Sequence, residues 1–375
     1  MNIVDRILEK VERLERNGVN KKDIEQILIE YFKNKDNSLL LELKSESPRY
    51  ISLNIIDISI SHKYEEFVSF LVENYIELVK KQGEYGDTYF HYIAKSGIES
   101  VLIKALEIDI DLAKIKNNHD KNTFLHVAAD NKLENVLVEA LRRNLELAKI
   151  QNREGDTFLH DAATNGLENV LVEALRRNLE LAKIQNREGD TFLHDAANIG
   201  LEKVLTEALK INPELAKIQN TKGDTFLHNA ADTGLKKVLI EALKINPELA
   251  KIQNRKGNTF LHDAANNKLE NVLIEALEIN PELAEIQNRK GNTFLHDAAN
   301  KKLENVLMKT LLYNAKQLKI VNTTNKTFLD LADDNCLRDL LIKVLSIGHD
   351  LSSDKSEEKI EDNNNLLDML SEMEK

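Results

Sequence analysis

The chain has 375 residues, a formal net charge of −12, no tryptophan and one cysteine, Cys336. The negative charge opposes non-specific attraction to nucleic-acid phosphates and to anionic membrane surfaces, so we expect no nucleic-acid partner. A single cysteine excludes an intramolecular disulfide framework and any site that needs two thiolates.

The amino-terminal residues 1–51 do not follow the repeat pattern that begins after them. Two segments within them, IVDRILEKVERLE and KKDIEQILIEYFKN, have apolar residues at helical spacing, and we expect a helical cap at one end of a repeat stack. The first residues lack the apolar stretch of a signal peptide, and no run approaches the ~20 apolar residues of a membrane span. We expect no membrane insertion, and a protein that is cytoplasmic or exported by a signal-peptide-independent route.

Residues 52–351 repeat one pattern, seen most clearly in GDTFLHDAAT at residues 155–164. Its copies lie 34 residues apart, except for one step of 35, and an eroded copy near Asn54 keeps only the apolar spacing. A fixed period of this length predicts stacked repeats, here about nine units of which the first and last are degenerate. The threonines that mark the pattern are Thr88, Thr123, Thr157, Thr191, Thr225, Thr259, Thr293 and Thr327.

One unit reads as a helix, a tight turn and a second helix. Thr157 can cap a short helix by accepting a hydrogen bond from a free backbone N–H group, a contribution of ~1 kcal/mol. The following segment, LENVLVEALRR, spaces its apolar residues for one helical face. The loop IQNREGD then leads to the next threonine through residues that favour turns. A unit of this size cannot bury its own apolar face, so neighbouring units must stack.

These residues resemble the ankyrin repeat, whose pattern is Thr-Pro-Leu-His-x-Ala-Ala-x-x-Gly, a second helix and a loop before the next Gly-x-Thr. The resemblance covers about residues 52–350 and implies an all-α repeat solenoid of stacked helix-turn-helix units with hairpin-like loops. Phe158 and its copies replace the proline of the pattern. Lysine replaces the turn glycine in three units, where a positive φ costs ~1 kcal/mol. Those lysines are Lys132, Lys268 and Lys302, against glycine at Gly166, Gly200 and Gly234.

Three units contain the sequence INPELA after the second helix, beginning at Ile211, Ile245 and Ile279. Its asparagine is a suitable helix cap, and its proline suits the first helical position. We expect a short extra helical turn in these three units.

The recurring histidine raises the question of a catalytic or metal-binding role. Stacked helices lie ~8 to 10 Å apart, so metal bonds of about 2 Å cannot join histidines of successive units. His160 and Asp161 are adjacent on a helix and point apart, which argues against a catalytic dyad. The resemblance implies that each histidine ties the loop backbone to the neighbouring unit. We expect no enzyme activity and no cofactor, and a structural role for His126, His160, His194, His228, His262 and His296.

Positions that vary between units are free to bind a partner, because stacking accounts for those that do not. The loop tips become more basic toward the carboxyl end, and the candidate residues there are Arg153, Arg187, Lys222, Arg255, Lys256, Arg289 and Lys290. A second set follows the histidine, and the resemblance implies that it lines a concave groove; its members are Asp161, Asp195, Asn229, Asp263 and Asp297. The charges predict a partner protein of complementary charge.

The carboxyl-terminal residues begin with a unit in which Asp330 replaces the histidine. Residues 352–375 form a polar, acidic tail that we expect to lack a fixed structure. Its apolar residues recur at helical spacing, and the alternative is that the tail folds onto a partner; these residues are Leu366, Leu367, Met369, Leu370 and Met373. The leading prediction is a monomeric interaction scaffold. The alternatives are a self-assembling structural protein and a regulatory subunit of an enzyme. The composition is similar to that of ankyrin repeat proteins of intracellular bacteria, which suggests an effector with a host protein as its partner.

Overall fold

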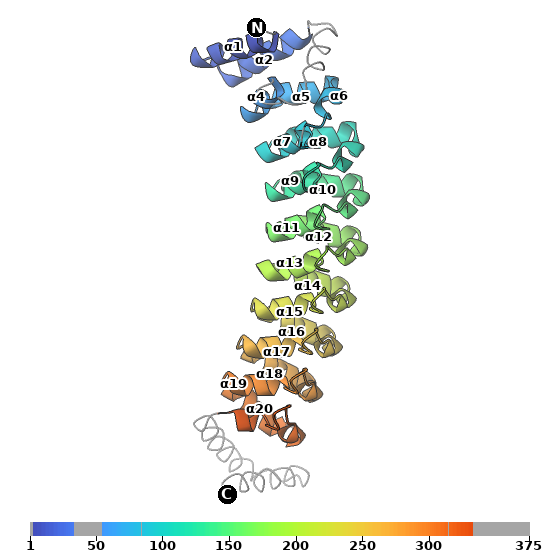
Figure 1. The fold of residues 1–375 in the computed structure, drawn as a ribbon, viewed down its shortest axis with the longest axis vertical. Helices are drawn as coiled ribbons and strands as arrows, with labels where there is room; N and C mark the ends of the chain where they lie inside the picture. Colours follow the sequence, from blue (N-terminus) through green and yellow to red (C-terminus); the bar gives the residue numbers. More distant parts are fainter. Residues whose placement is uncertain (1–2, 34–54, 84, 314, 333–375) are drawn as a thin grey trace. The chain divides into compact units, whose positions relative to one another are not determined.

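The computed structural model describes residues 3–33, 55–83, 85–313 and 315–332. Contacts divide the chain into two compact units, unit 1 of residues 1–187 and unit 2 of residues 188–375, and each is described by itself. All regular secondary structure within the described ranges is helical. The predicted all-α class is therefore confirmed (Figure 1).

Unit 1 begins with the two helices predicted for the amino-terminal segment, and repeat helices follow them. In each repeat, a short first helix after the threonine is followed by a longer second helix and then by a 3₁₀ turn. The elements are α1 Ile3–Arg16, α2 Lys21–Lys33, α4 Ile55–Ser61, α5 Glu65–Asn74, α6 Ile76–Val79, α7 Tyr89–Ser96, α8 Glu99–Ile108, η1 Ile110–Lys114, α9 Phe124–Asp130, α10 Glu134–Arg143, η2 Leu145–Lys149, α11 Phe158–Thr164, α12 Glu168–Arg177 and η3 Leu179–Lys183.

Unit 2 has the same order of first helix, second helix and 3₁₀ turn. Its last described element is a single short turn at the position where a first helix is expected. The elements are α13 Phe192–Ile199, α14 Glu202–Ile211, η4 Pro213–Lys217, α15 Phe226–Asp232, α16 Lys236–Ile245, η5 Pro247–Lys251, α17 Phe260–Asn266, α18 Glu270–Ile279, η6 Pro281–Glu285, α19 Phe294–Asn300, α20 Glu304–Tyr313, η7 Ala315–Lys319 and η8 Leu329–Leu331.

Successive repeats pack first helix on first helix and second helix on second helix. In unit 1, α7 contacts α9 and α9 contacts α11, while α8, α10 and α12 form a parallel series. Unit 2 repeats this arrangement from α13 to α19 and from α14 to α20. The core between the layers is aliphatic, with one fully buried phenylalanine per repeat, for example Phe158 and Phe260. Burial of such a side chain contributes about 1.5–3 kcal/mol, so each repeat is stabilised by its neighbours.

The turn between the two helices adopts a positive φ whether its residue is glycine or lysine. The φ angle is 77° at Gly166 and 80° at Gly234, and it is 59° at Lys132, 58° at Lys268 and 61° at Lys302. Lysine therefore takes the same left-handed backbone conformation as glycine at the equivalent position.

The extra helical turn occurs more widely than predicted. It is present in the three INPELA units as η4, η5 and η6, but also as η1, η2 and η3, which contain no proline. These turns share a capping side chain, which is asparagine in η2 to η6 and Asp109 in η1. Asn144 Oδ1 accepts a hydrogen bond from Glu146 N at 3.0 Å, and Asp109 Oδ1 accepts one from Asp111 N at 3.0 Å. The side-chain cap therefore specifies the turn, and proline is not required.

The amino-terminal helices pack against the first repeat helices of unit 1. The Phe32 ring of α2 meets the Phe67 ring of α5 edge-on, with centroids 5.2 Å apart. Glu25 is buried and its Oε1 accepts a hydrogen bond from Glu66 N at 3.1 Å, and the Tyr64 hydroxyl donates to Glu15. The boundary predicted at residue 51 and the tail predicted at 352–375 lie outside the described residues.

Candidate interaction surface

The repeated histidine links its own helix cap to the loop of the next repeat. In α17, Nδ1 of His262 accepts a hydrogen bond from the Thr259 backbone N–H group at 3.1 Å and lies 2.9 Å from Thr259 Oγ1. Nε2 of the same ring lies 3.0 Å from the backbone oxygen of Asn292, 30 residues later. A backbone N–H group can only donate, so Nδ1 is the acceptor and the proton is on Nε2. The same pair of bonds occurs at His91, His126, His194, His228 and His296.

This environment keeps the ring neutral. Desolvation by burial lowers the pKa of His126 and of His262 to about 4, and it also lowers the pKa of His194 and His228. A neutral ring with both nitrogens engaged has neither a free acceptor for a metal nor a proton to deliver near pH 7. Within the described residues, no group of three histidine, cysteine or acidic side chains could hold a metal ion.

The loop tips are held in a hydrogen-bonded ladder. In the tip at Arg255, Asn254 Oδ1 accepts from Lys256 N at 2.9 Å and from Asn258 N at 3.1 Å, while Asn254 Nδ2 donates to Asp224 at 2.7 Å. Arg255 N donates to the backbone oxygen of Lys222, in the tip one repeat earlier, at 3.0 Å. Each tip therefore has a fixed backbone, and only its outward side chains differ between repeats.

Glutamine side chains add a second line of bonds along the same loops. Gln253 Nε2 donates to the backbone oxygen of Gly257 at 2.7 Å and to that of Gln287 in the next repeat at 2.9 Å. In unit 1, Gln151 makes the same two bonds, to Gly155 at 2.7 Å and to Gln185 at 2.9 Å. The loops of consecutive repeats are thus joined within each unit.

The candidate cations at the tips are exposed. In unit 2, Lys222, Arg255, Lys256, Arg289 and Lys290 are all exposed, and none forms an ion pair within the described part of the chain. In unit 1, Arg153 and Arg187 are also exposed, and Arg153 Nη2 donates to the backbone oxygen of Asn118 at 3.2 Å. Exposed cations that form no ion pair are available to anionic groups of another molecule.

The acidic candidates on the first helices are less exposed than the tip cations. Asp161, Asp195, Asn229 and Asp263 are half-buried, and Asp297 is buried with 9% of its surface exposed. Desolvation by burial raises the pKa of Asp263 to about 7 and that of Asp297 to about 6. The charge on this face is therefore smaller than the number of aspartates indicates.

Two features of this surface were not predicted from the sequence. Asn258 Nδ2 donates to Asp263 Oδ1 at 3.1 Å, so the tip residue before the threonine partly satisfies the buried carboxyl group. At the end of α13, Ile199 has 52% of its surface exposed at a position where the next repeats have Thr233 and Asn267. The change from polar to apolar at a fixed repeat position was the available signal for Ile199.

No family model matches the sequence, and no curated protein matches it. Among solved structures, the ankyrin repeat domain of Bcl-3, a member of the IκB protein family, is similar with a TM-score of 0.50 and 22% sequence identity; the match covers 60% of this chain and 99% of that one. The chain has the ankyrin repeat fold. No helix in the described ranges is long and apolar enough to cross a bilayer.

Proposed function

We propose that the protein is a non-enzymatic scaffold that binds a partner protein through the loop tips of unit 2 and the adjacent first helices. The observation that carries the proposal is a difference between the backbone and the side chains of each tip. The backbone is fixed by bonds to the neighbouring repeats, whereas the cations of the tips are exposed and unpaired. A row of exposed cations on a fixed backbone, without ion pairs in the described part of the chain, favours an anionic segment of a partner, because the backbone of the tips loses little conformational entropy on binding.

The first helices supply the other part of the surface. Asp195 and Asn229 offer polar groups next to the tips, and Ile199 offers an exposed apolar side chain among them. We infer a partner that presents acidic residues to the tips and an apolar residue to Ile199, since apolar contacts supply affinity while charges mainly set association rate and specificity. The resemblance in composition supports a further proposal, that the partner is a host protein reached by signal-peptide-independent export.

The test compares the intact chain with a variant in which four tip cations are reversed. The variant carries Arg255→Glu, Lys256→Glu, Arg289→Glu and Lys290→Glu, and proximity labelling with each chain identifies proteins that only the intact chain reaches. The affinity of the purified partner is then measured at two salt concentrations. We expect at least a tenfold loss in the variant and weaker binding of the intact chain at high salt.

A matched control reverses four exposed lysines that lie outside the tips, namely Lys203, Lys210, Lys236 and Lys319. It has the same net charge as the tip variant, so a general effect of charge would weaken both equally. Equal affinities of the intact chain and the tip variant, with no dependence on salt, would contradict the proposal.

A further inference from the structure

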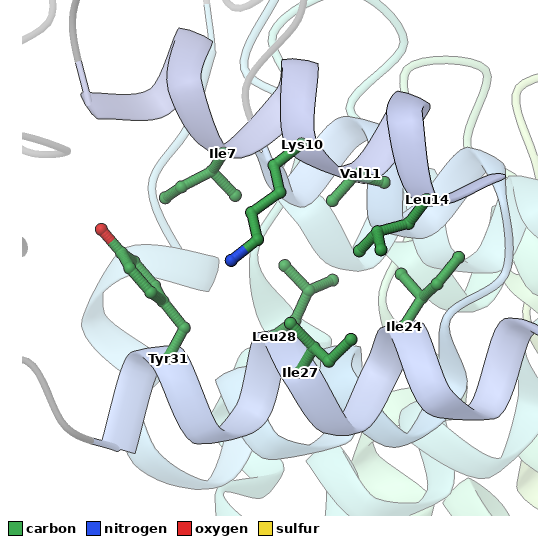
Figure 2. A pocket seen from close by; sticks show the side chains of 8 residues that line it. All are labelled: Ile7, Lys10, Val11, Leu14, Ile24, Ile27, Leu28 and Tyr31. Atoms are coloured by element: carbon green, nitrogen blue, oxygen red, sulfur yellow. The ribbon is translucent and has the colours of Figure 1, made fainter. Parts of the chain in front are cut away.

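The amino-terminal helices enclose an open apolar groove that no repeat helix fills. Its volume is about 140 Å³, and Figure 2 shows apolar side chains of α1 facing those of α2 across it. An apolar cavity of about 150 Å³ can hold a molecule the size of benzene, so the groove has room for one or two branched side chains. The apolar residues that line it are Ile7, Val11, Leu14, Ile24, Ile27 and Leu28.

The groove is separate from the contacts that attach these helices to the repeats. Those contacts use Phe32, Glu25 and Glu15, none of which lines the groove. Leu14 and Ile27 remain partly exposed at the groove, although apolar side chains of this size are usually buried. An apolar side chain placed in the groove would remove this remaining apolar surface from water.

One cation lines the groove, on the α1 side, and a second exposed cation lies one turn away. Lys10 lines the groove with an exposed side chain, and Figure 2 shows it extending toward α2. Arg13, one turn further along α1, is also exposed. Neither residue has an ion pair within the described part of the chain. The chemistry of the groove therefore suits a segment with a few branched or flexible apolar side chains and acidic residues around them.

The chain contains such a segment at its carboxyl end. We propose that residues 366–373 of a second copy bind in this groove. Leu366, Leu370 and Met373 are spaced to share one helical face, and methionine adapts to irregular apolar gaps. Residues 352–375 contain eight acidic and three basic residues, a charge opposite to that of Lys10 and Arg13.

Because the segment comes from a second copy, the contact does not depend on how the two ends of one chain are arranged. The contact joins the groove of one copy to a different segment of the next, so it is heterologous and can continue from copy to copy. Self-association would replace the monomer expected from the sequence. The proposal is independent of the proposed function, because it uses neither the loop tips nor the first helices of unit 2.

The test measures the mass of the full-length chain by sedimentation over about 1 to 100 μM, a range suited to a small interface. A groove variant, Ile27→Glu, alters a partly exposed residue, and a tail variant combines Leu366→Ser, Leu370→Ser and Met373→Ser. We expect the mass of the unaltered chain to rise more than twofold above 42.7 kDa, while each variant alone stays at that value. An equimolar mixture of the two variants should reach a dimer and stop, since only one groove and one tail remain functional.

The control variant is Glu9→Gln, which changes an exposed residue about 160° around α1 from Val11 and should associate like the unaltered chain. The circular dichroism of Ile27→Glu must match that of the unaltered chain, and the mixed dimer independently shows that the intact groove of the tail variant is functional. A mass of 42.7 kDa at every concentration, association that persists in the tail variant, or a mixture no heavier than its components would each overturn the proposal. Reversal of the tip cations should leave this self-association unchanged, which separates it from the proposed function.

Discussion

The loop at residues 153–156 in unit 1 and the loop at residues 255–258 in unit 2 have the same backbone bonds but different charges. Asn152 Oδ1 accepts from the N–H groups of Glu154 and Asp156 at 2.9 and 3.0 Å, and Asn254 makes the equivalent bonds at 2.9 and 3.1 Å. The unit 1 loop has the sequence Arg-Glu-Gly-Asp, whereas the unit 2 loop has Arg-Lys-Gly-Asn. The framework and the presented charge are therefore separate properties of the repeat.

The same comparison extends to the first helices. Asn258 in unit 2 replaces Asp156 in unit 1, and its amide group donates to the half-buried Asp263. Asn292 stands in the same relation to Asp297, at 3.5 Å. One change from aspartate to asparagine thus makes the tip more basic and provides a donor for a carboxyl group that burial has made costly to ionise.

The largest effect should follow from a change that breaks the framework shared by the two loops. A Cβ atom at Gly257 would lie 2.7 Å from the backbone nitrogen of Arg289, and the φ angle there is 78°. The backbone of the next loop would have to move, so we expect Gly257→Ala to lower the free energy of unfolding by about 3 kcal/mol. Urea denaturation measures this change.

The matched control for that variant is Gly234→Ala, at a turn with a φ angle of 80° and no atom within 4 Å of the added Cβ. Only the positive φ angle is unfavourable for alanine there, and we expect the free energy of unfolding to fall by about 1 kcal/mol. Equal losses of stability in the two variants would show that the close approach of successive loops does not add to the effect of Gly257→Ala.

Acidification should destabilise the repeats to different extents, because they share the histidine but differ in the residue after it. Burial lowers the pKa of His126 and His262 to about 4, below the ~6.5 of an unfolded chain. Each of these histidines therefore lowers the free energy of unfolding as the pH falls from 6.5 toward 4, by about 2 kcal/mol at pH 5. Asp263 has the opposite sign: burial raises its pKa to about 7, so the folded state takes up its proton first and gains stability over the same range.

Hydrogen exchange at pH 7.5 and pH 5, corrected for the intrinsic rates, measures this difference helix by helix. The helix α9 has Val127 where α17 has Asp263, so α9 should lose more protection than α17 on acidification. Burial also raises the pKa of Asp130, at the end of α9, which offsets part of its loss. Identical changes in α9 and α17 would contradict the assigned roles of His262 and Asp263.

A smaller effect should come from removing the buried charge in unit 2. Asp263→Asn keeps an oxygen for the Asn258 donor and reproduces the residue found at Asn229 in α15. At pH 8 the variant should be more stable by about 2 kcal/mol, because the native carboxylate must ionise while partly buried. At pH 5 only part of the gain should remain, and it should vanish below about pH 4, where the carboxyl group of the unfolded chain is protonated as well. A gain of the same size at both pH values would count against this explanation.

The sequence predicted the repeated elements well because their determinants are local. The spacing of Thr157 and the following apolar residues located the helices, and the glycine at Gly166 indicated the φ angle of Lys132. The acceptor role of Nδ1 and the burial of Asp263 could not be predicted, because they depend on the threonine cap and on loops of adjacent repeats acting together. The groove between α1 and α2 likewise depends on how closely two helices approach, which helical periodicity does not specify.

The smallest effect should appear where lysine occupies the left-handed turn. Lys268 has a φ angle of 58° in a repeat whose second helix, ENVLIEAL, closely matches ENVLVEAL after Gly166. Lys268→Gly should stabilise the fold by about 0.5–1 kcal/mol, since relief of the strained conformation exceeds the added flexibility of the unfolded chain. Gly166→Lys is the reciprocal change and should destabilise by a similar amount, measured by urea denaturation. Opposite signs for these two variants would support strain in the turn, whereas a loss in both would mean that the lysine side chain makes a stabilising contact that outweighs it.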